Sequence, residues 1–155
     1  MTVELNSTVP DFVASCTGKE FKLSDLSGKR VVIYFYPKDN TPGCTTEGQN
    51  FSELHPQFLK SDCAVFGVSR DSLRSHESFK AKMGFPFELI SDPDEKVCNI
   101  FGVMKTKNMY GKQVVGVERS TFVINKKGVL VQQWRGVKVP GHVQAVLDFV
   151  QTMTD

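Results

Sequence analysis

The sequence has little of what marks a membrane, secreted or nucleic-acid-binding protein. Its longest apolar run spans Val31–Tyr36, whereas a helix that crosses a bilayer needs about 20 apolar residues. The first residues form neither a basic segment nor an apolar one, so no secretory signal is expected there. The 19 lysines and arginines nearly balance the 17 acidic residues, and the net charge of +2 gives no reason to expect nucleic acid. We therefore expect a cytoplasmic protein that binds neither membranes nor nucleic acids.

The cysteines lack the spacings of zinc sites and of disulfide frameworks. Cys16, Cys44, Cys63 and Cys98 include no C-x-x-C pair and no other metal-ligand spacing. In a reducing compartment all four would remain thiols.

The histidines show a similar lack of grouping. His55, His76 and His142 belong to no H-x-x-x-H pair and to no His/Asp group in the sequence. Because metal sites usually draw on such groups, we expect surface or boundary positions for these side chains. No metal and no other cofactor is predicted.

Composition and length indicate a globular domain. Hydrophobic residues make up 40% of the chain and charged residues 23%, as in typical globular domains. The 155 residues contain no internal repeat, low-complexity tract or Pro/Ser-rich linker. We expect residues 1–155 to form a single domain.

Strand-like and helix-like segments alternate along the chain. The unbroken run at 31–36 is typical of a central strand that is covered on both faces. Strands are predicted at 31–36, 64–69, 87–90, 119–124 and 129–134. Helices are predicted at 42–60, 72–83, 91–102 and 141–152, and the basic segment 105–112 is predicted to be a surface loop.

The order of these segments predicts the fold class. The first strands are joined through helices, which gives parallel crossovers, and the last two strands form an antiparallel hairpin around the turn at 125–128. We therefore expect an α/β protein of thioredoxin-like fold, in which a mixed central β-sheet is flanked by helices on both faces.

Cys44 is the one cysteine that follows a predicted strand and opens a predicted helix. If Thr41 is the N-cap, Pro42 and Gly43 are the first two helical residues and Cys44 is the third. A free thiol has a pKa of about 8.5, and a helix N-terminus or a nearby cation can lower that pKa until thiolate is the main form. Because only the thiolate attacks, Cys44 is the candidate nucleophile.

A sequence motif surrounds this cysteine. Residues 37–47 read P-K-D-N-T-P-G-C-T-T-E. They resemble the peroxiredoxin signature P-x-x-x-T-x-x-C, in the T-P-G-C-T-x-E form of the bacterioferritin comigratory protein, or peroxiredoxin Q, subfamily. The resemblance covers nearly the whole chain, since 10–12 and 23–29 are similar to the family's N-terminal entry and 118–124 to its arginine-bearing strand. The same resemblance favours a monomer.

The resemblance implies thiol-dependent reduction of hydrogen peroxide and organic hydroperoxides, in antioxidant defence. Cys44 would attack the terminal peroxide oxygen, and the Thr41 hydroxyl would hydrogen-bond both the thiolate and the peroxide. Backbone N–H groups around Gly43 and Cys44 would stabilise charge on the leaving oxygen. Pro37 would shield the pocket, and Glu47 would act electrostatically on the first turn of the helix.

Arg119 is the cation that the resemblance assigns to the site. It begins a predicted strand. If that strand runs antiparallel to 31–36, Arg119 lies beside the carboxyl end of 31–36 and can reach Cys44. Arg70 and Arg74 are rival cations, because they follow the strand at 64–69 and could reach the same edge.

The sulfenic acid formed on Cys44 must be reduced through a second thiol. Many members of the subfamily carry a resolving cysteine five residues after the nucleophile or about 36 residues after it, where this sequence has Gln49 and Lys80. An external thiol system, thioredoxin or glutathione with glutaredoxin, is therefore the first expectation. A disulfide between chains and an internal disulfide are the alternatives, with Cys98 the first internal candidate and Cys63 and Cys16 behind it.

Two other functions would use an activated thiol on this fold. A redox sensor or thiol-binding module would use Cys44 without efficient peroxidase turnover. A disulfide oxidoreductase is disfavoured, because its resolving thiol lies one helical turn from the first and the sequence has no C-x-x-C pair.

Overall fold

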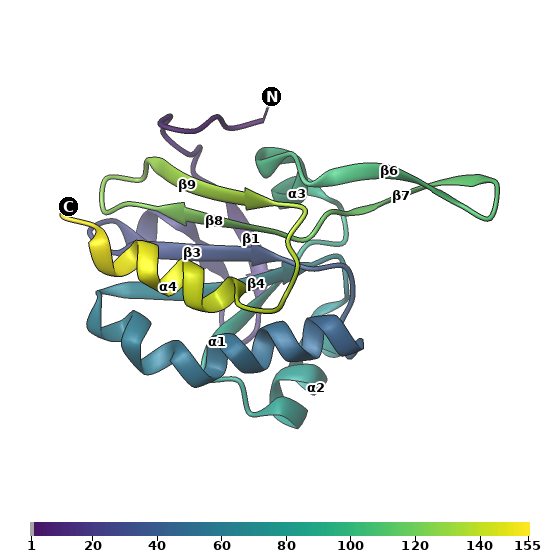
Figure 1. Ribbon diagram of the computed structural model, residues 1–155, viewed down its shortest axis with the longest axis horizontal. Helices are drawn as coiled ribbons and strands as arrows, with labels where there is room; N and C mark the ends of the chain where they lie inside the picture. Colours follow the sequence, from purple (N-terminus) through teal and green to yellow (C-terminus); the bar gives the residue numbers. More distant parts are fainter. Residues whose placement is uncertain (1) are drawn as a thin grey trace.

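A seven-stranded mixed sheet forms the centre of the computed structural model, which describes residues 2–155 (Figure 1). The strand order is β2-β1-β5-β4-β3-β8-β9, and β6 and β7 form a separate two-stranded ribbon. The strands are β1 (Val13–Cys16), β2 (Phe21–Lys22), β3 (Arg30–Phe35), β4 (Cys63–Ser69), β5 (Glu88–Ser91), β6 (Met104–Met109), β7 (Lys112–Val117), β8 (Ser120–Ile124) and β9 (Leu130–Arg135). The helices are α1 (Pro42–Lys60), α2 (Leu73–Met83), α3 (Lys96–Phe101) and α4 (His142–Thr152), with a short 3-10 turn η1 (Leu23–Leu26).

Strand β3 lies in the interior of the sheet and is covered on both faces, as its unbroken apolar sequence predicts. It pairs parallel with β4 and antiparallel with β8. Side chains alternate between the two faces of a strand, so Ile33 and Phe35 pack in one hydrophobic core whereas Val32 and Tyr34 pack in another. The sheet therefore separates two cores.

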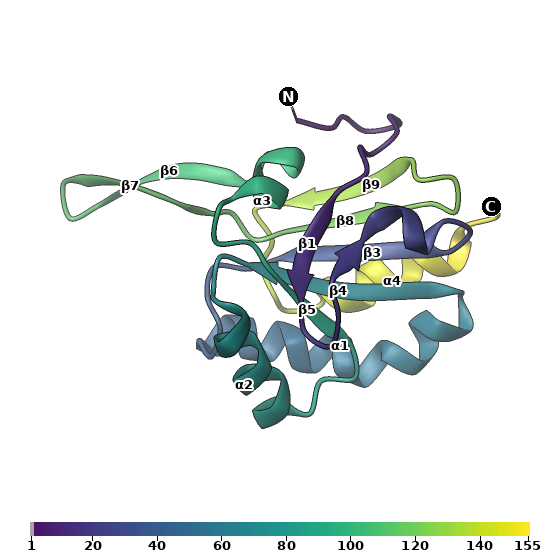
Figure 2. The ribbon, with the colours of Figure 1, turned by 180° about the vertical axis from the view of Figure 1, so that it is seen from behind.

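Helices cover both faces of this sheet, which confirms the predicted fold class. Apolar residues of α1, α2 and α4 pack in one core, and those of α3 and η1 pack in the other. Helices α1 and α4 lie in front of the sheet in Figure 1, whereas α3 and η1 come to the front in Figure 2. Within the described residues, no helix has the length and apolarity that a bilayer span requires.

The segment predicted as a basic surface loop, 105–112, lies in an antiparallel ribbon, so that prediction is wrong. Strands β6 and β7 pair along their whole length and project beyond the sheet (Figure 1). Tyr110 and Gly111 form the turn with positive φ at both positions, as in a two-residue hairpin turn. The residues 105–108 are all polar and exposed, so they lack the apolar alternation from which a strand is predicted.

Two short strands near one edge of the sheet, and the start of one helix, also differ from the sequence-based expectation. The sequence does not predict β1 and β2, which are too short to show a clear alternation. The helix expected to open at residue 91 begins at Lys96, after a turn in which the Asp92 carboxylate accepts from the N–H groups of Val97 and Cys98. The other predicted strands and helices are present, with ends displaced by a residue or so.

Candidate active site

The candidate nucleophile lies where β3 leads into α1. Thr41 is the N-cap of α1, Pro42 is its first residue and Cys44 is its third, as predicted. Cys44 is only 2% exposed. The first hydrogen bond of the helix runs from the Thr45 N–H to the Thr41 carbonyl. The N–H groups of Gly43 and Cys44 therefore precede the helical ladder, at the positive end of the helix dipole.

The structure brings the Arg119 guanidinium to Cys44. Strand β8 runs antiparallel to β3, so Arg119, which directly precedes β8, lies beside the carboxyl end of β3. Arg119 Nη2 donates to Cys44 Sγ at 3.4 Å. The two rival cations are placed differently from Arg119. Arg70 donates to Glu95 at 2.9 Å, and Arg74 is exposed. Strand pairing thus places the predicted cation at the sulfur.

Glu47 contacts the same guanidinium from α1. Its carboxyl group is fully buried, and Oε1 accepts a hydrogen bond from Arg119 Nη1 at 2.6 Å. Glu47 lies in the second turn of α1, so the expectation that it acts on the first turn is wrong. Burial raises the pKa of Glu47 to about 7, and the attraction of Arg119 offsets only part of this effect.

The guanidinium itself keeps its charge. Burial disfavours the charged form of Arg119, but Glu47 and Cys44 on either side outweigh that effect and raise the pKa of Arg119 above its ordinary value. A permanent cation therefore lies between a carboxyl group and the candidate nucleophile.

Thr41 and Pro37, the other predicted site residues, lie on the loop between β3 and α1. The Thr41 hydroxyl donates to the Lys38 carbonyl at 2.9 Å and does not cap a helix N–H. Its oxygen still has lone pairs that can accept a hydrogen bond. Pro37 is exposed, just after the end of β3. The roles expected of both residues stay predictions.

The other three cysteines lie away from Cys44. Cys16 and Cys98 pack in the core on the opposite face of the sheet. Cys63 follows the C-terminal end of α1, so most of that helix, roughly 25 Å, separates it from Cys44. Burial raises the pKa of Cys16 and Cys63 to about 12 and raises that of Cys98 further. These thiols therefore stay protonated at neutral pH, and only the thiolate is nucleophilic.

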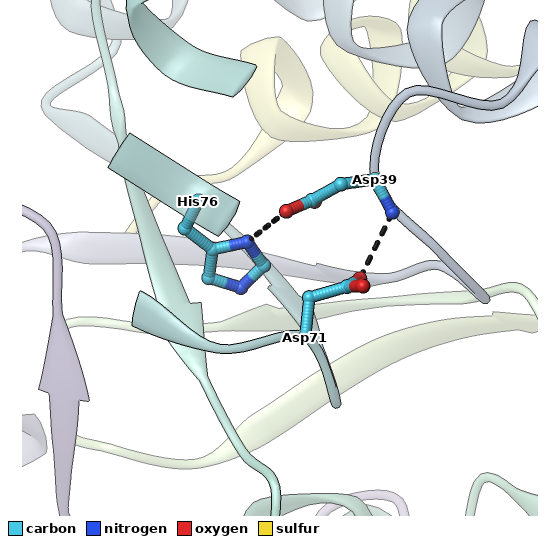
Figure 3. Close-up of side chains that lie close together, drawn as sticks. All are labelled: Asp39, Asp71 and His76. Carbon is cyan, nitrogen blue, oxygen red and sulfur yellow. Dashed lines mark hydrogen bonds and ion pairs between the residues drawn. The ribbon is translucent and has the colours of Figure 1, made fainter. Parts of the chain in front are cut away.

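Two of the three histidines are buried, so the expectation of surface or boundary positions is wrong for them. His76 is fully buried, and its Nδ1 lies 2.7 Å from Asp39 Oδ2 (Figure 3). His142 is buried at the start of α4, and burial together with the charge of Arg119 lowers the pKa of His142 to about 4. His55 is half-buried, as predicted.

Asp39, Asp71 and His76 are close enough to hold a metal ion, since their ligand atoms lie within 4.8 Å of one another. Hydrogen bonds already use these atoms. The Asp39 carboxylate accepts from the hydroxyls of Tyr36 and Ser75, and Asp71 Oδ2 accepts from the Asp39 N–H (Figure 3). The group is satisfied by protein donors, so it does not indicate a metal site.

Comparison with known proteins places this site in a family. A sequence model of the AhpC/TSA family matches residues 5–133 of this chain. The chain belongs to the AhpC/TSA family. Peroxiredoxin Bcp of Xanthomonas campestris is 53% identical over 146 residues, which cover 94% of this chain and 91% of that protein. Peroxiredoxin Bcp of Bacillus subtilis is 44% identical over 156 residues, with coverage of 100% and 99%.

Solved structures of relatives have the same fold. Peroxiredoxin Q of Xanthomonas campestris, at 53% identity, superposes with a TM-score of 0.88 and covers 90% of this chain and 89% of that chain. A PrxQ mutant structure from Xylella fastidiosa, at 45% identity, gives a TM-score of 0.92 over 97% of both chains. The expected thioredoxin-like fold is confirmed, and the chain is a peroxiredoxin, a thiol-dependent peroxidase.

The raised pKa of Glu47 predicts a specific pH dependence of stability. In the unfolded chain Glu47 loses its proton near its ordinary pKa of 4.5, whereas in the folded chain it keeps the proton until about pH 7. Stability from this group is therefore present at low pH and is lost as the pH rises through that window. The free energy of unfolding of wild type, relative to Glu47→Gln, should fall by up to about 3 kcal/mol between these pH values.

Urea unfolding of both proteins across this pH range measures the difference. The matched control is Glu53→Gln, an exposed position on the same helix, which should leave the pH dependence of wild type unchanged. A difference that grows with rising pH would show instead that pairing with Arg119 outweighs burial.

Proposed function

We propose that Cys44 is the nucleophile that reduces hydrogen peroxide and organic hydroperoxides. The observation that carries this proposal is the 3.4 Å contact between Arg119 Nη2 and the Cys44 sulfur at the N-terminus of α1. A cation and the positive end of a helix both favour the thiolate. A structure of the bacterioferritin comigratory protein of Xanthomonas campestris, at 52% identity, concerns alkyl peroxide reduction by that protein. This supports organic hydroperoxides as substrates here.

The proposed reaction is a displacement at the outer oxygen of the peroxide. The Cys44 thiolate attacks this oxygen, the O–O bond breaks, and its electron pair goes to the inner oxygen. That oxygen takes up a proton and leaves as water or an alcohol, while the sulfur is oxidised to a sulfenic acid. Arg119 and the N–H groups of Gly43 and Cys44 would stabilise the negative charge on the leaving oxygen.

Thr41 and Pro37 would set where the peroxide lies. The hydroxyl hydrogen of Thr41 is held by the Lys38 carbonyl, so Thr41 Oγ1 would accept a hydrogen bond from the peroxide O–H and turn its outer oxygen toward the sulfur. A hydrogen bond from Thr41 to the thiolate would require the hydroxyl to leave Lys38. Pro37 would shield the site with a residue that has no N–H to compete for the substrate.

We further propose that an external thiol reduces the sulfenic acid. Gln49 and Lys80 occupy the positions at which relatives carry a resolving cysteine, and Cys98 lies on the opposite face of the sheet from Cys44. One external thiol would condense with the sulfenic acid and release water, and a second would displace Cys44 from the mixed disulfide. Thioredoxin, or glutathione with glutaredoxin, would supply these thiols and their two electrons.

The setting in which the enzyme works is part of the same proposal. A monomer with one domain over residues 1–155, in the cytoplasm and in antioxidant defence, fits the sequence. The four cysteines are free and buried, which supports a reducing compartment.

Peroxide consumption tests the assignment of Cys44 and Arg119. With thioredoxin and its reductase, or with glutathione and glutaredoxin, wild type should complete many turnovers and Cys44→Ser none. Arg119→Met should lower kcat/KM for hydrogen peroxide roughly 100-fold or more, because it removes a donor to the developing oxyanion. Arg70→Met is the matched control and should behave as wild type, since Arg70 pairs with Glu95.

Two outcomes would contradict the proposal. An unchanged rate in Arg119→Met would remove Arg119 from the reaction. Only a few turnovers by wild type with either reductant would favour the redox sensor.

Replacing the buried Cys98 tests whether an external thiol reduces the sulfenic acid on Cys44. Cys98→Ala should keep the wild-type turnover number with the thioredoxin system, and peptide mapping of protein treated with one equivalent of peroxide should show a sulfenic acid on Cys44. A disulfide between Cys44 and Cys16, Cys63 or Cys98 would contradict this, as would loss of turnover in folded Cys98→Ala.

A further inference from the structure

A buried histidine outside the peroxide site faces hydrogen-bond acceptors with both ring nitrogens. His76 lies on α2 and is fully buried. Its Nδ1 lies 2.7 Å from Asp39 Oδ2 (Figure 3), and its Nε2 lies 2.8 Å from the backbone carbonyl of Ile90. A neutral imidazole carries one N–H and can donate to only one of these oxygens. Both nitrogens can donate at once only in an imidazolium, which carries a proton on each nitrogen.

Asp39 is arranged as the counter-ion of this ring. Its Oδ1 accepts from the Tyr36 hydroxyl at 2.6 Å, and its Oδ2 accepts from the Ser75 hydroxyl at 2.8 Å. Burial raises the pKa of Tyr36 well above its ordinary value, so this hydroxyl stays protonated and remains a donor. Hydrogen bonds to a carboxylate favour its charged form. The geometry therefore suits Asp39 as an acceptor of a hydrogen bond from the ring.

The other groups around the ring are acidic or neutral. Asp39 comes from the loop between β3 and α1, and Asp71 comes from the loop between β4 and α2. Tyr36, just after β3, packs its ring 6.2 Å from that of His76. Strand β5 contributes the Ile90 carbonyl. In the described part of the chain, no lysine or arginine forms an ion pair with Asp39 or Asp71.

The contact between Asp39 and His76 holds the loop that leads to Cys44. Asp39 lies five residues before Cys44, and its N–H donates to Asp71 Oδ2 at 2.9 Å. The next residue, Asn40, has a φ of 60° and accepts from Lys82 Nζ at 3.0 Å. Asparagine adopts this left-handed conformation more readily than most other residues, and the hydrogen bonds to Asp71 and from Lys82 hold the loop in place. The contacts of the loop are therefore what fix its path.

We propose that His76, as a buried imidazolium, is a positioning residue for Cys44. By holding Asp39 against α2 and β5, it fixes the path of the loop into the N-cap Thr41. It thereby sets the position of the sulfur relative to Arg119, which reaches the site from the β8 side. The kinetic part of this inference rests on the peroxidase function proposed for Cys44.

Nitrogen NMR of the ring tests its protonation directly. In long-range 1H–15N spectra of reduced wild type at neutral pH, both His76 nitrogens should have the chemical shifts of an imidazolium, assigned by their loss in His76→Asn. His55, whose pKa is lowered by burial, is the internal reference and should appear neutral in the same spectrum. A neutral tautomer at His76 would overturn the proposal.

Two substitutions separate positioning from stability alone. In His76→Asn the amide nitrogen takes the place of Nδ1 and can still donate to Asp39, whereas in His76→Gln it takes the place of Nε2 and can donate only to Ile90. In single-turnover mixing with hydrogen peroxide, the rate constant for Cys44 oxidation should fall roughly 10- to 100-fold in His76→Gln. The fall in His76→Asn should be smaller, and His55→Asn should react as wild type.

Equal rate constants in wild type and both folded His76 variants would overturn the proposal, because the ion pair would then contribute stability alone. If either variant fails to fold, Tyr36→Phe replaces it, since this change removes one hydrogen bond to Asp39 and keeps the ring. Its rate constant should also fall, and an unchanged value would overturn the proposal.

Failure of the peroxidase function would be distinguishable from failure of this inference. If the peroxidase function is wrong, wild type would leave peroxide unreduced. The pH profile for alkylation of Cys44 by iodoacetamide would still differ between wild type and His76→Gln if His76 positions the sulfur, and identical profiles would overturn the inference.

Discussion

The guanidinium of Arg119 is the contact on which the site depends, because it donates to the Cys44 sulfur with one nitrogen and to the buried Glu47 carboxyl group with the other. Cys44 and Glu47 are both on α1, and Arg119 directly precedes β8. The antiparallel register of β3 with β8 is what brings these two elements to one point. Any change that shifts α1 against β8 would therefore separate Cys44 from Arg119.

The sheet also separates Cys44 from two of the other cysteines. Cys44 shares its core with α1, α2 and α4, whereas Cys16 and Cys98 lie in the core on the other face. Those two thiols are kept protonated by burial, and only Cys44 combines a helix N-terminus with an adjacent cation. The sheet thus separates Cys44, the proposed nucleophile, from Cys16 and Cys98, whereas Cys63 shares its core but lies at the far end of α1.

Local patterns in the sequence are enough to predict β3, α1 and the place of Cys44 at their junction, since an apolar run followed by a capping residue and proline describes a strand leading into a helix. The choice of Arg119 over Arg70 and Arg74 depended on the resemblance to peroxiredoxins together with an assumption about strand pairing. The pair of His76 with Asp39 could not be predicted, because the two residues are 37 positions apart and no local pattern connects them. The ribbon of β6 and β7 was not predicted for a different reason, since residues 105–108 of β6 are polar and exposed and lack apolar alternation.

The central proposal is that Arg119 and the N-terminus of α1 favour the thiolate form of Cys44. The most direct test is the ultraviolet absorbance of thiolate in the reduced protein during a pH titration, taken as the difference between wild type and Cys44→Ser. The account predicts thiolate absorbance that is already present at neutral pH and disappears in acid, and a weaker signal at neutral pH in Arg119→Met. Absorbance that appears only under alkaline conditions, with the same course in Arg119→Met, would contradict it.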